Sequence, residues 1–185
     1  GVISLTGVGA RFSSLLLGLA EASTLLALVF AMVIAIILGM GMPTTAAYAV
    51  AASVVAPGLV QLGVEPLVAH FFVFYFAVIS AITPPVALAA YAGGAIAGAD
   101  PMKTSVESFR FGLTAFVVPF MFFYNAALLM EAEPLVIARA AVTAMVGVWF
   151  LTHAVQGWFL GPLGPVPRLL LLAAALSMIA GGIVT

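Results

Sequence analysis

The sequence contains no cysteine and very few charged residues. The absence of thiols excludes disulfide bonds, thiolate nucleophiles and thiolate metal sites. Charged residues make up 6% of the 185 residues and hydrophobic residues 65%, whereas a soluble domain is about 25% charged and about 45–50% apolar. No water-soluble fold of this length can hide so much apolar surface, so the composition predicts an integral membrane protein whose natural solvent is lipid.

The sequence also lacks the motifs of several function classes. There is no basic run, and the net charge is −1, which argues against a nucleic-acid partner. His-Glu-x-x-His, Gly-x-Ser-x-Gly and a phosphate-binding loop are absent, as is a pair of intramembrane aspartates. We therefore expect no enzyme activity, no catalytic residue and no covalent cofactor.

Two long stretches, residues 22–64 and 66–99, carry no charged side chain. Each is longer than the roughly 20 residues that one helical crossing needs. Each is interrupted near its middle, at Pro43-Thr44-Thr45 and at Thr83-Pro84-Pro85. Proline lacks an N–H and disfavours helix in the residue before it, so both points are predicted to break helices.

Two arrangements fit this pattern. One is four short spans joined by tight turns. The other is a re-entrant helical hairpin over residues 25–63 followed by a discontinuous helix over residues 67–97. Non-helical backbone at membrane depth requires burial in protein or a wet cavity, and the charge distribution does not decide between the two arrangements.

The rest of the chain predicts simpler elements. We expect an interfacial helix over residues 100–108 and a span over residues 109–130, kinked at Pro119. Residues 131–185 predict an extension with two transmembrane helices, the second over residues 169–184. The fold class is thus an all-α membrane protein. His70 lies near an expected membrane edge. This position favours an interfacial or packed histidine over a proton carrier.

The two breaks are candidate binding elements. Glycine, proline and hydroxyl residues at a helix interruption leave carbonyl oxygens free, and such unwound carbonyls coordinate Na⁺ in secondary transporters. Half-helix N-termini attract the anionic groups of substrates. Either break alone could instead be a structural kink.

Four segments together resemble a known family. They are Gly39-Met-Gly-Met-Pro-Thr-Thr-Ala-Ala-Tyr48, Ile82-Thr-Pro-Pro-Val-Ala-Leu-Ala-Ala-Tyr91, Ile96-Ala-Gly-Ala-Asp-Pro-Met-Lys-Thr104 and Val118-Pro-Phe-Met-Phe-Phe-Tyr-Asn125. In this order they resemble the large (DctM-like) permease subunits of TRAP transporters, particularly the fused permeases of the TAXI branch. The resemblance covers roughly residues 5–130, so residues 1–130 are expected to be the C-terminal repeat of such a permease and the chain a C-terminal fragment.

The resemblance implies an elevator mechanism, in which the second inverted repeat contributes one hairpin and one broken helix. It implies substrate-binding residues at the two breaks, namely Thr44, Thr45, Thr83, Pro84 and Pro85. It implies Na⁺ ligands from the same segments, namely Gly41, Met42, Pro43, Thr44, Ile82 and Thr83. Some family members carry an acidic residue where this chain has Ala81, so neutral oxygens are expected to serve here.

The same resemblance implies the partners. They are a periplasmic solute-binding protein, a small membrane subunit or its fused equivalent, the missing N-terminal half, membrane lipid and a small organic acid as substrate. The expected location is the cytoplasmic (inner) membrane of a bacterium or archaeon, with several crossings. Two alternatives stay open: an elevator-type ion-coupled carrier without a binding protein, and a membrane module that only scaffolds partners.

Overall fold

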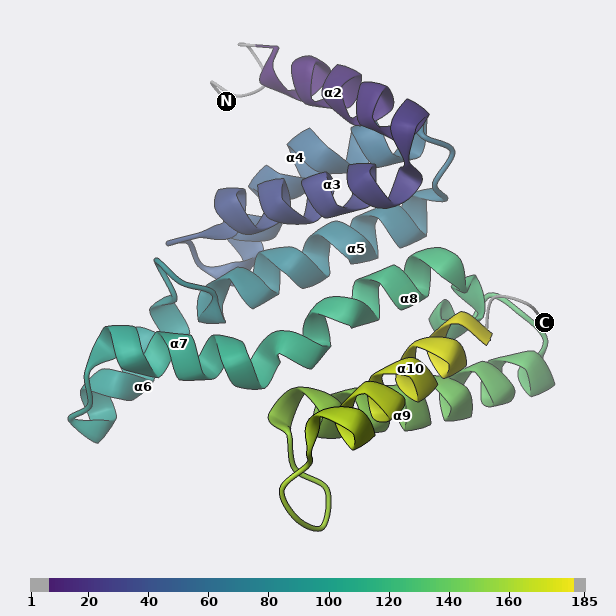
Figure 1. Ribbon diagram of the computed structural model, residues 1–185. Helices are drawn as coiled ribbons and strands as arrows, with labels where there is room; N and C mark the ends of the chain where they lie inside the picture. Colours follow the sequence, from purple (N-terminus) through teal and green to yellow (C-terminus); the bar gives the residue numbers. More distant parts are fainter. Residues whose placement is uncertain (1–6, 182–185) are drawn as a thin grey trace. The chain divides into compact units, whose positions relative to one another are not determined.

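The computed structural model describes residues 7–181 (Figure 1). Within that range the secondary structure is helical, and the only extended pairing is an isolated bridge between Trp158 and Pro162. Three helical stretches in residues 7–181 are long and apolar enough to cross a membrane: Thr44–Gln61, Pro101–Tyr124 and Pro134–Gln156. The predicted fold class, an all-α membrane protein, is confirmed.

The chain divides into two compact units, Gly1–Gly112 and Leu113–Thr185. The elements of the first unit, in chain order, are α2 (Val8–Ala22), α3 (Thr24–Gly39), α4 (Thr44–Gln61), α5 (Pro66–Ile79), the short 3₁₀ helix η1 (Ser80–Ile82), α6 (Leu88–Ala97) and α7 (Pro101–Gly112). The elements of the second unit are η2 (Leu113–Val117), α8 (Val118–Tyr124), η3 (Ala126–Leu129), α9 (Pro134–Gln156) and α10 (Pro165–Gly181).

In the first unit, α3 and α4 form a helical hairpin, and both α2 and α5 pack against the two helices of that hairpin (Figure 1). Small residues line these contacts. Ala31 and Ala35 of α3 and Ala47 and Ala51 of α4 are almost completely buried. Small side chains allow helix backbones to approach closely within lipid, where packing rather than hydrophobic exclusion holds helices together. The outer faces of the same helices expose large apolar side chains such as Leu26.

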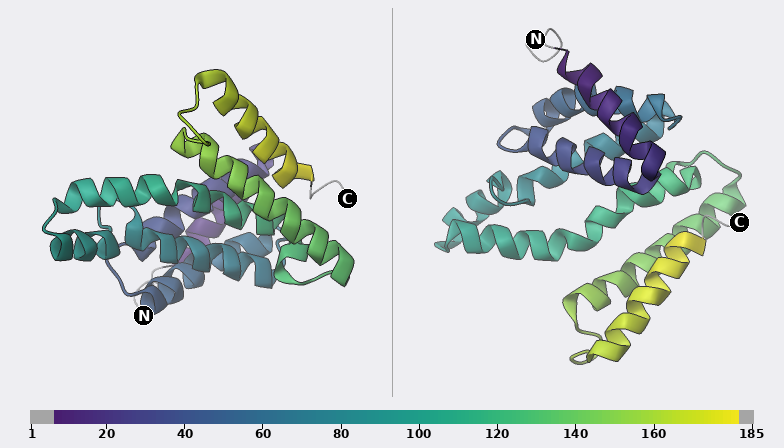
Figure 2. Two further views of the ribbon diagram at one scale, coloured as in Figure 1. Left: turned by 90° about the horizontal axis from the view of Figure 1, so that it is seen from below. Right: turned by 45° about the horizontal axis from the view of Figure 1, so that its top comes forward.

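In the second unit, α9 and α10 lie side by side, as both views in Figure 2 show. They run antiparallel, because Gly147 of α9 faces Ile179 near the end of α10 while Arg168 near the start of α10 reaches the end of α9. The Arg168 guanidinium donates hydrogen bonds to the carbonyls of Ala154 and Val155. A cation at this position satisfies carbonyls that a helix C-terminus leaves free.

The helix expected over residues 109–130 is divided in the structure. The backbone changes to a 3₁₀ conformation at Leu113, resumes as α8 at Val118, and changes again after Tyr124. Pro119 lies in the first turn of α8, where its missing N–H costs nothing, instead of kinking a continuous helix. Asn125 ends α8, and its side-chain oxygen accepts a hydrogen bond from the Ala127 amide.

The boundary expected at residue 130 marks the end of a family repeat and the start of an extension. The division into two compact units does not test that boundary, so it remains a prediction. Residues 182–184, the end of the last predicted span, lie outside the described residues.

Candidate functional site

The first predicted break is a tight turn at the tip of the α3–α4 hairpin. Helix α3 ends at Gly39 and α4 begins at Thr44. Gly41 in between has a φ of +76°, a conformation that glycine adopts without a Cβ penalty. Pro43 precedes the first residue of α4 and has no N–H. The turn therefore reverses the chain without any charged residue.

The second break separates η1 from α6. Residues 83–87 between them are non-helical, and the Pro84–Pro85 peptide is cis. The Tyr91 hydroxyl donates a hydrogen bond from α6 back to the Pro85 carbonyl. This contact ties the non-helical segment to the helix that follows it.

The two breaks meet. A Cβ added to Gly39 would lie 2.6 Å from the Ser80 Oγ and 3.1 Å from the Ala77 carbonyl oxygen. A Cβ on Gly41 would lie 3.5 Å from a methyl carbon of Val86. The end of α3 and the hairpin tip thus pack directly against the end of α5 and the segment that follows it.

Several oxygens at the junction are free to bind a ligand. Among the described residues, no backbone amide donates to the carbonyls of Gly41 or Met42 at the tip, or of Ile82 in the second break. The hydroxyls of Thr44 and Thr45 are exposed and make no hydrogen bond with residues 7–181.

The two hydroxyls on the other side of the junction are buried and already donate. Ser80 Oγ donates to the Ala77 carbonyl at 2.6 Å, and Thr83 Oγ1 donates to the Ile79 carbonyl at 2.9 Å. A hydroxyl that donates its proton still has lone pairs for a second partner. Both oxygens can therefore accept a hydrogen bond or face a cation.

The donor set is neutral. No group of three or more His, Asp or Glu side chains gathers anywhere in residues 7–181. Carbonyl and hydroxyl oxygens suit hard cations and offer nothing to a soft transition metal. The amides at the start of α4, which has no side-chain cap, are in turn suited to a negatively charged group.

The nine predicted site residues all lie in the two breaks, which touch through Gly39, Gly41, Ser80 and Val86. Thr83 is buried; Met42, Ile82 and Pro84 are half-buried; Gly41, Pro43, Thr44, Thr45 and Pro85 are exposed. Sequence reasoning missed the residues through which the breaks touch, since Gly39, Ser80 and Val86 were assigned no contact. A glycine at the last position of α3 was the available signal, because it permits close approach.

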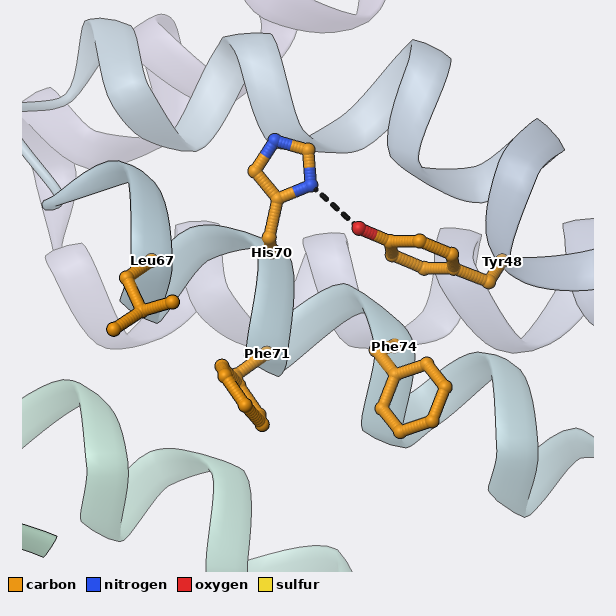
Figure 3. Close-up of a pocket in the computed structure, with 5 residues that line it drawn as sticks. All are labelled: Tyr48, Leu67, His70, Phe71 and Phe74. Atoms are coloured by element: carbon orange, nitrogen blue, oxygen red, sulfur yellow. Dashed lines mark hydrogen bonds between the residues drawn. The ribbon is translucent and has the colours of Figure 1, made fainter. Parts of the chain in front are cut away.

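A second polar pair lies farther along the hairpin. The Tyr48 hydroxyl of α4 and Nδ1 of His70 in α5 are 2.8 Å apart (Figure 3). They border an open groove of about 320 Å³ that is otherwise lined by Leu67, Phe71 and Phe74. The Tyr48 ring also meets the Phe74 ring edge to face, with centroids 5.5 Å apart. His70 is exposed, and its expected interfacial or packed role remains a prediction.

Comparison with known proteins identifies one family. Residues 1–134 match the family described as the tripartite ATP-independent periplasmic transporter, DctM component. No curated protein and no solved structure matches the chain.

Proposed function

The chain belongs to the DctM family of tripartite ATP-independent periplasmic transporters, and from this premise we propose that it forms one half of the ion and substrate site of a Na⁺-coupled solute importer. The family is a transporter component and not an enzyme family. The observation that carries the proposal is the junction of the two breaks, where Gly39 and Gly41 pack against Ser80 and Val86.

Sodium is the coupling ion in this proposal. Na⁺ is held well by neutral oxygens, and unwound carbonyls in broken helices are its usual ligands in secondary transporters. Carbonyls of Gly41, Met42 and Ile82 and hydroxyls of Thr44 and Thr83 supply such oxygens. Pro43 has no N–H to donate, while the Gly39 carbonyl accepts a hydrogen bond from the Met42 amide.

The substrate is proposed to be a small organic acid. Its carboxylate would lie at the start of α4, where the amides of the first turn and the free hydroxyls of Thr44 and Thr45 are hydrogen-bond donors. The second break would form the facing wall with Thr83, Pro84 and Pro85. These two prolines present apolar ring atoms and no N–H, so specificity on that wall comes from shape.

The α3–α4 hairpin and the broken helix α5–η1–α6 are proposed to be the re-entrant hairpin and discontinuous helix of an elevator-type transport domain. Their packing as one unit, with small residues at the helix contacts, supports movement as a rigid body. We propose that the chain belongs to the fused TAXI branch, on the four segments that resemble it.

The partners follow from the family. A periplasmic solute-binding protein delivers the solute, a small membrane subunit or its fused equivalent completes the scaffold, and the other inverted repeat completes the site. The proposed location is the cytoplasmic membrane, which the chain crosses several times.

Proton coupling is the second candidate, because Tyr48 and His70 form a hydrogen-bonded pair at the edge of a groove. An ionisable residue in a membrane segment is a functional candidate. The pair lies apart from the unwound segments on α4 and α5, so the two candidates involve different residues.

Uptake into proteoliposomes by the intact permease tests the proposal. The assay is run with and without the binding protein, and with an inward gradient of either Na⁺ or H⁺. Uptake that needs both the binding protein and Na⁺ supports the proposed function. Uptake driven by H⁺ alone would overturn the sodium assignment, and uptake without the binding protein would identify a carrier that takes solute directly.

A further inference from the structure

The connector between α9 and α10, residues 157–164, projects from the paired helices as a narrow loop (Figure 1). The isolated bridge between Trp158 and Pro162 forms its neck. The Phe159 ring meets the Trp149 ring of α9 edge to face, with centroids 5.4 Å apart. The loop is therefore fixed to the end of α9, and none of its residues belongs to the junction of the two breaks.

Leu160 at the tip of this loop is unusual in two respects. Its φ is +54°, a conformation that is uncommon for a residue with a side chain, although Gly161 follows it directly. Its side chain is 95% exposed, so packing within the described part of the chain does not offset the backbone strain. A large apolar side chain held exposed by strained backbone points to a partner outside the chain.

Arg168 lies beside the neck of the loop. A guanidinium has five N–H donors, and two of those of Arg168 bond the Ala154 and Val155 carbonyls. Its other terminal nitrogen, Nη1, lies 3.8 Å from the position of a Cβ added to Gly157, the first residue of the loop. Arg168 is exposed, and residues 7–181 supply it with no further acceptor. The remaining N–H groups are therefore available to an external acceptor.

The charge at this end of the two helices has one sign. The sequence contains no Asp or Glu after Glu133, and Glu133 lies at the opposite end of α9. Arg168 is the only Lys or Arg after Arg139. Guanidinium and phosphate form strong, often bidentate, charge-assisted hydrogen bonds. Because no carboxylate is present here to accept a second cation, an anionic phosphate compound fits better than a zwitterionic one.

The length of α9 places the loop at a membrane boundary. Pro134–Gln156 is long and apolar enough to cross a membrane, and Arg139 is its only Asp, Glu, Lys or Arg. From Arg139 to Gln156 the helix rises roughly 25 Å, close to the hydrocarbon thickness of about 30 Å. A span with Arg139 at one boundary therefore has the loop at the other. Trp158, which is 59% exposed, is a residue type enriched at the level of the lipid headgroups.

We propose that the loop between α9 and α10 binds an anionic phospholipid of the surrounding bilayer. The Arg168 guanidinium and the Trp158 indole N–H donate to the phosphate, and Leu160 enters the boundary between headgroups and acyl chains. This part of the chain follows residue 134, at which the family match ends. The proposal therefore does not rest on the proposed transport function.

The test uses the intact permease in detergent and follows hydrogen exchange of the backbone amides in residues 157–164. Four probes are added in turn: dioctanoyl phosphatidylglycerol, dioctanoyl phosphatidylcholine, dioctanoylglycerol and inorganic phosphate. We expect phosphatidylglycerol to slow exchange in the loop several-fold, and each of the other three probes to slow it less. The solute-binding protein is added in a separate experiment and should leave exchange in the loop unchanged.

Five results would overturn the proposal. Equal slowing by dioctanoylglycerol would mean that apolar contact alone acts at the loop. Equal slowing by inorganic phosphate would identify a site for the free ion, and equal slowing by phosphatidylcholine would remove the preference for an anionic headgroup. Slowing by the solute-binding protein in place of lipid would identify a protein-docking loop. No slowing by phosphatidylglycerol would exclude a lipid at the loop.

A leucine variant tests the tip of the loop. Leu160→Asn removes the apolar side chain but keeps a residue that tolerates a positive φ, so it should weaken the slowing by phosphatidylglycerol without unfolding the loop. Met130→Asn is the matched control, because Met130 has a φ of +67° and is 74% exposed but precedes Glu131, at the opposite end of α9. It should leave the slowing unchanged, and equal loss in the two variants would place the lipid elsewhere.

Two arginine variants separate lipid binding from the capping of α9. Arg168→Lys and Arg168→Met both lose the paired bonds to the Ala154 and Val155 carbonyls, but only the lysine keeps a positive charge. Phosphatidylglycerol should still slow exchange in Arg168→Lys and should no longer slow it in Arg168→Met. Slowing that is kept in both variants, or lost in both alike, would restrict Arg168 to capping and overturn its role in lipid binding.

Discussion

Gly39, the last residue of α3, lies so close to Ser80 at the end of α5 that a Cβ on the glycine would sit 2.6 Å from the serine Oγ. This contact joins the hairpin to the broken helix. A hydroxyl that is fixed by its own hydrogen bond to Ala77 cannot move aside freely. The two breaks can therefore approach this closely only because Gly39 has no side chain.

Gly39→Ala should separate the two breaks. The added methyl group meets both Ser80 Oγ and the Ala77 carbonyl, and overpacking of this kind costs about 1–3 kcal/mol. We expect a lower unfolding temperature for the intact permease in detergent. We also expect solute uptake to fall by more than the loss of folded protein explains. Gly18→Ala is the matched control, since its Cβ meets nothing within 4 Å. A second substitution, Ser80→Ala, should restore part of the stability of Gly39→Ala; no restoration would mean that another contact carries the cost.

Loss of the threonine hydroxyls at the junction should weaken sodium activation. Thr83→Val removes a buried oxygen and its hydrogen bond to Ile79, so we expect about 1 kcal/mol of lost stability together with a several-fold rise in the Na⁺ concentration for half-maximal uptake. Thr44→Ala removes an exposed hydroxyl and should raise that concentration with little change in stability.

The controls for sodium activation separate ligand from structure. Thr83→Ser keeps the oxygen and should keep the Na⁺ dependence. Thr24→Ala removes an exposed hydroxyl at the opposite end of the hairpin and should change nothing. Unaltered Na⁺ activation in both Thr44→Ala and Thr83→Val would exclude these residues as ligands.

The sequence predicted the two interruptions because proline and glycine act locally. The apolar run continues to Met42, yet α3 ends at Gly39 and Gly41 takes a positive φ. Proline and glycine thus determine that a turn forms, whereas the packing of α3 and α4 determines the residue at which it begins. The sequence predicted a division between residues 108 and 109, whereas α7 continues to Gly112 before the backbone becomes 3₁₀ at Leu113.

Contacts between distant residues could not be predicted in the same way. Gly39 faces Ser80, and Tyr48 reaches His70, only because α3 and α4 both pack against α5 with a particular rotation and offset. Those quantities depend on the fit of many small and large side chains at once. A single sequence shows which residues suit a site, but not which of them meet.

The Tyr48–His70 pair provides a test of whether a hydrogen bond or simple packing holds this part of α4 and α5 together. A double-mutant cycle with Tyr48→Phe and His70→Phe should give a coupling free energy of about 0.5–1.5 kcal/mol, the range for one hydrogen bond. Tyr48→Phe keeps the ring contact with Phe74. A sodium-coupled mechanism further predicts that Tyr48→Phe leaves the Na⁺ dependence unchanged. A coupling free energy near zero would mean that the two rings only pack against each other. If Tyr48→Phe or His70→Phe abolished uptake driven by a proton gradient, the second candidate function would be favoured instead.

Arg168 should hold the connector between α9 and α10 in place. Its Nε and one terminal nitrogen donate to the carbonyls of Ala154 and Val155 at the end of α9, and the cation faces the negative end of the helix. Arg168→Met keeps much of the side-chain volume but removes both bonds, so we expect about 1–2 kcal/mol of lost stability in the second unit. Hydrogen exchange of the backbone amides in residues 157–164 should increase, because Leu163 and Trp158 donate to carbonyls at the same helix end.

The control is Arg139→Met, which replaces an exposed arginine in the first half of α9 and should leave exchange in the connector unaltered. If both variants increase exchange alike, the loss of a positive charge, and not the capping of α9, is responsible.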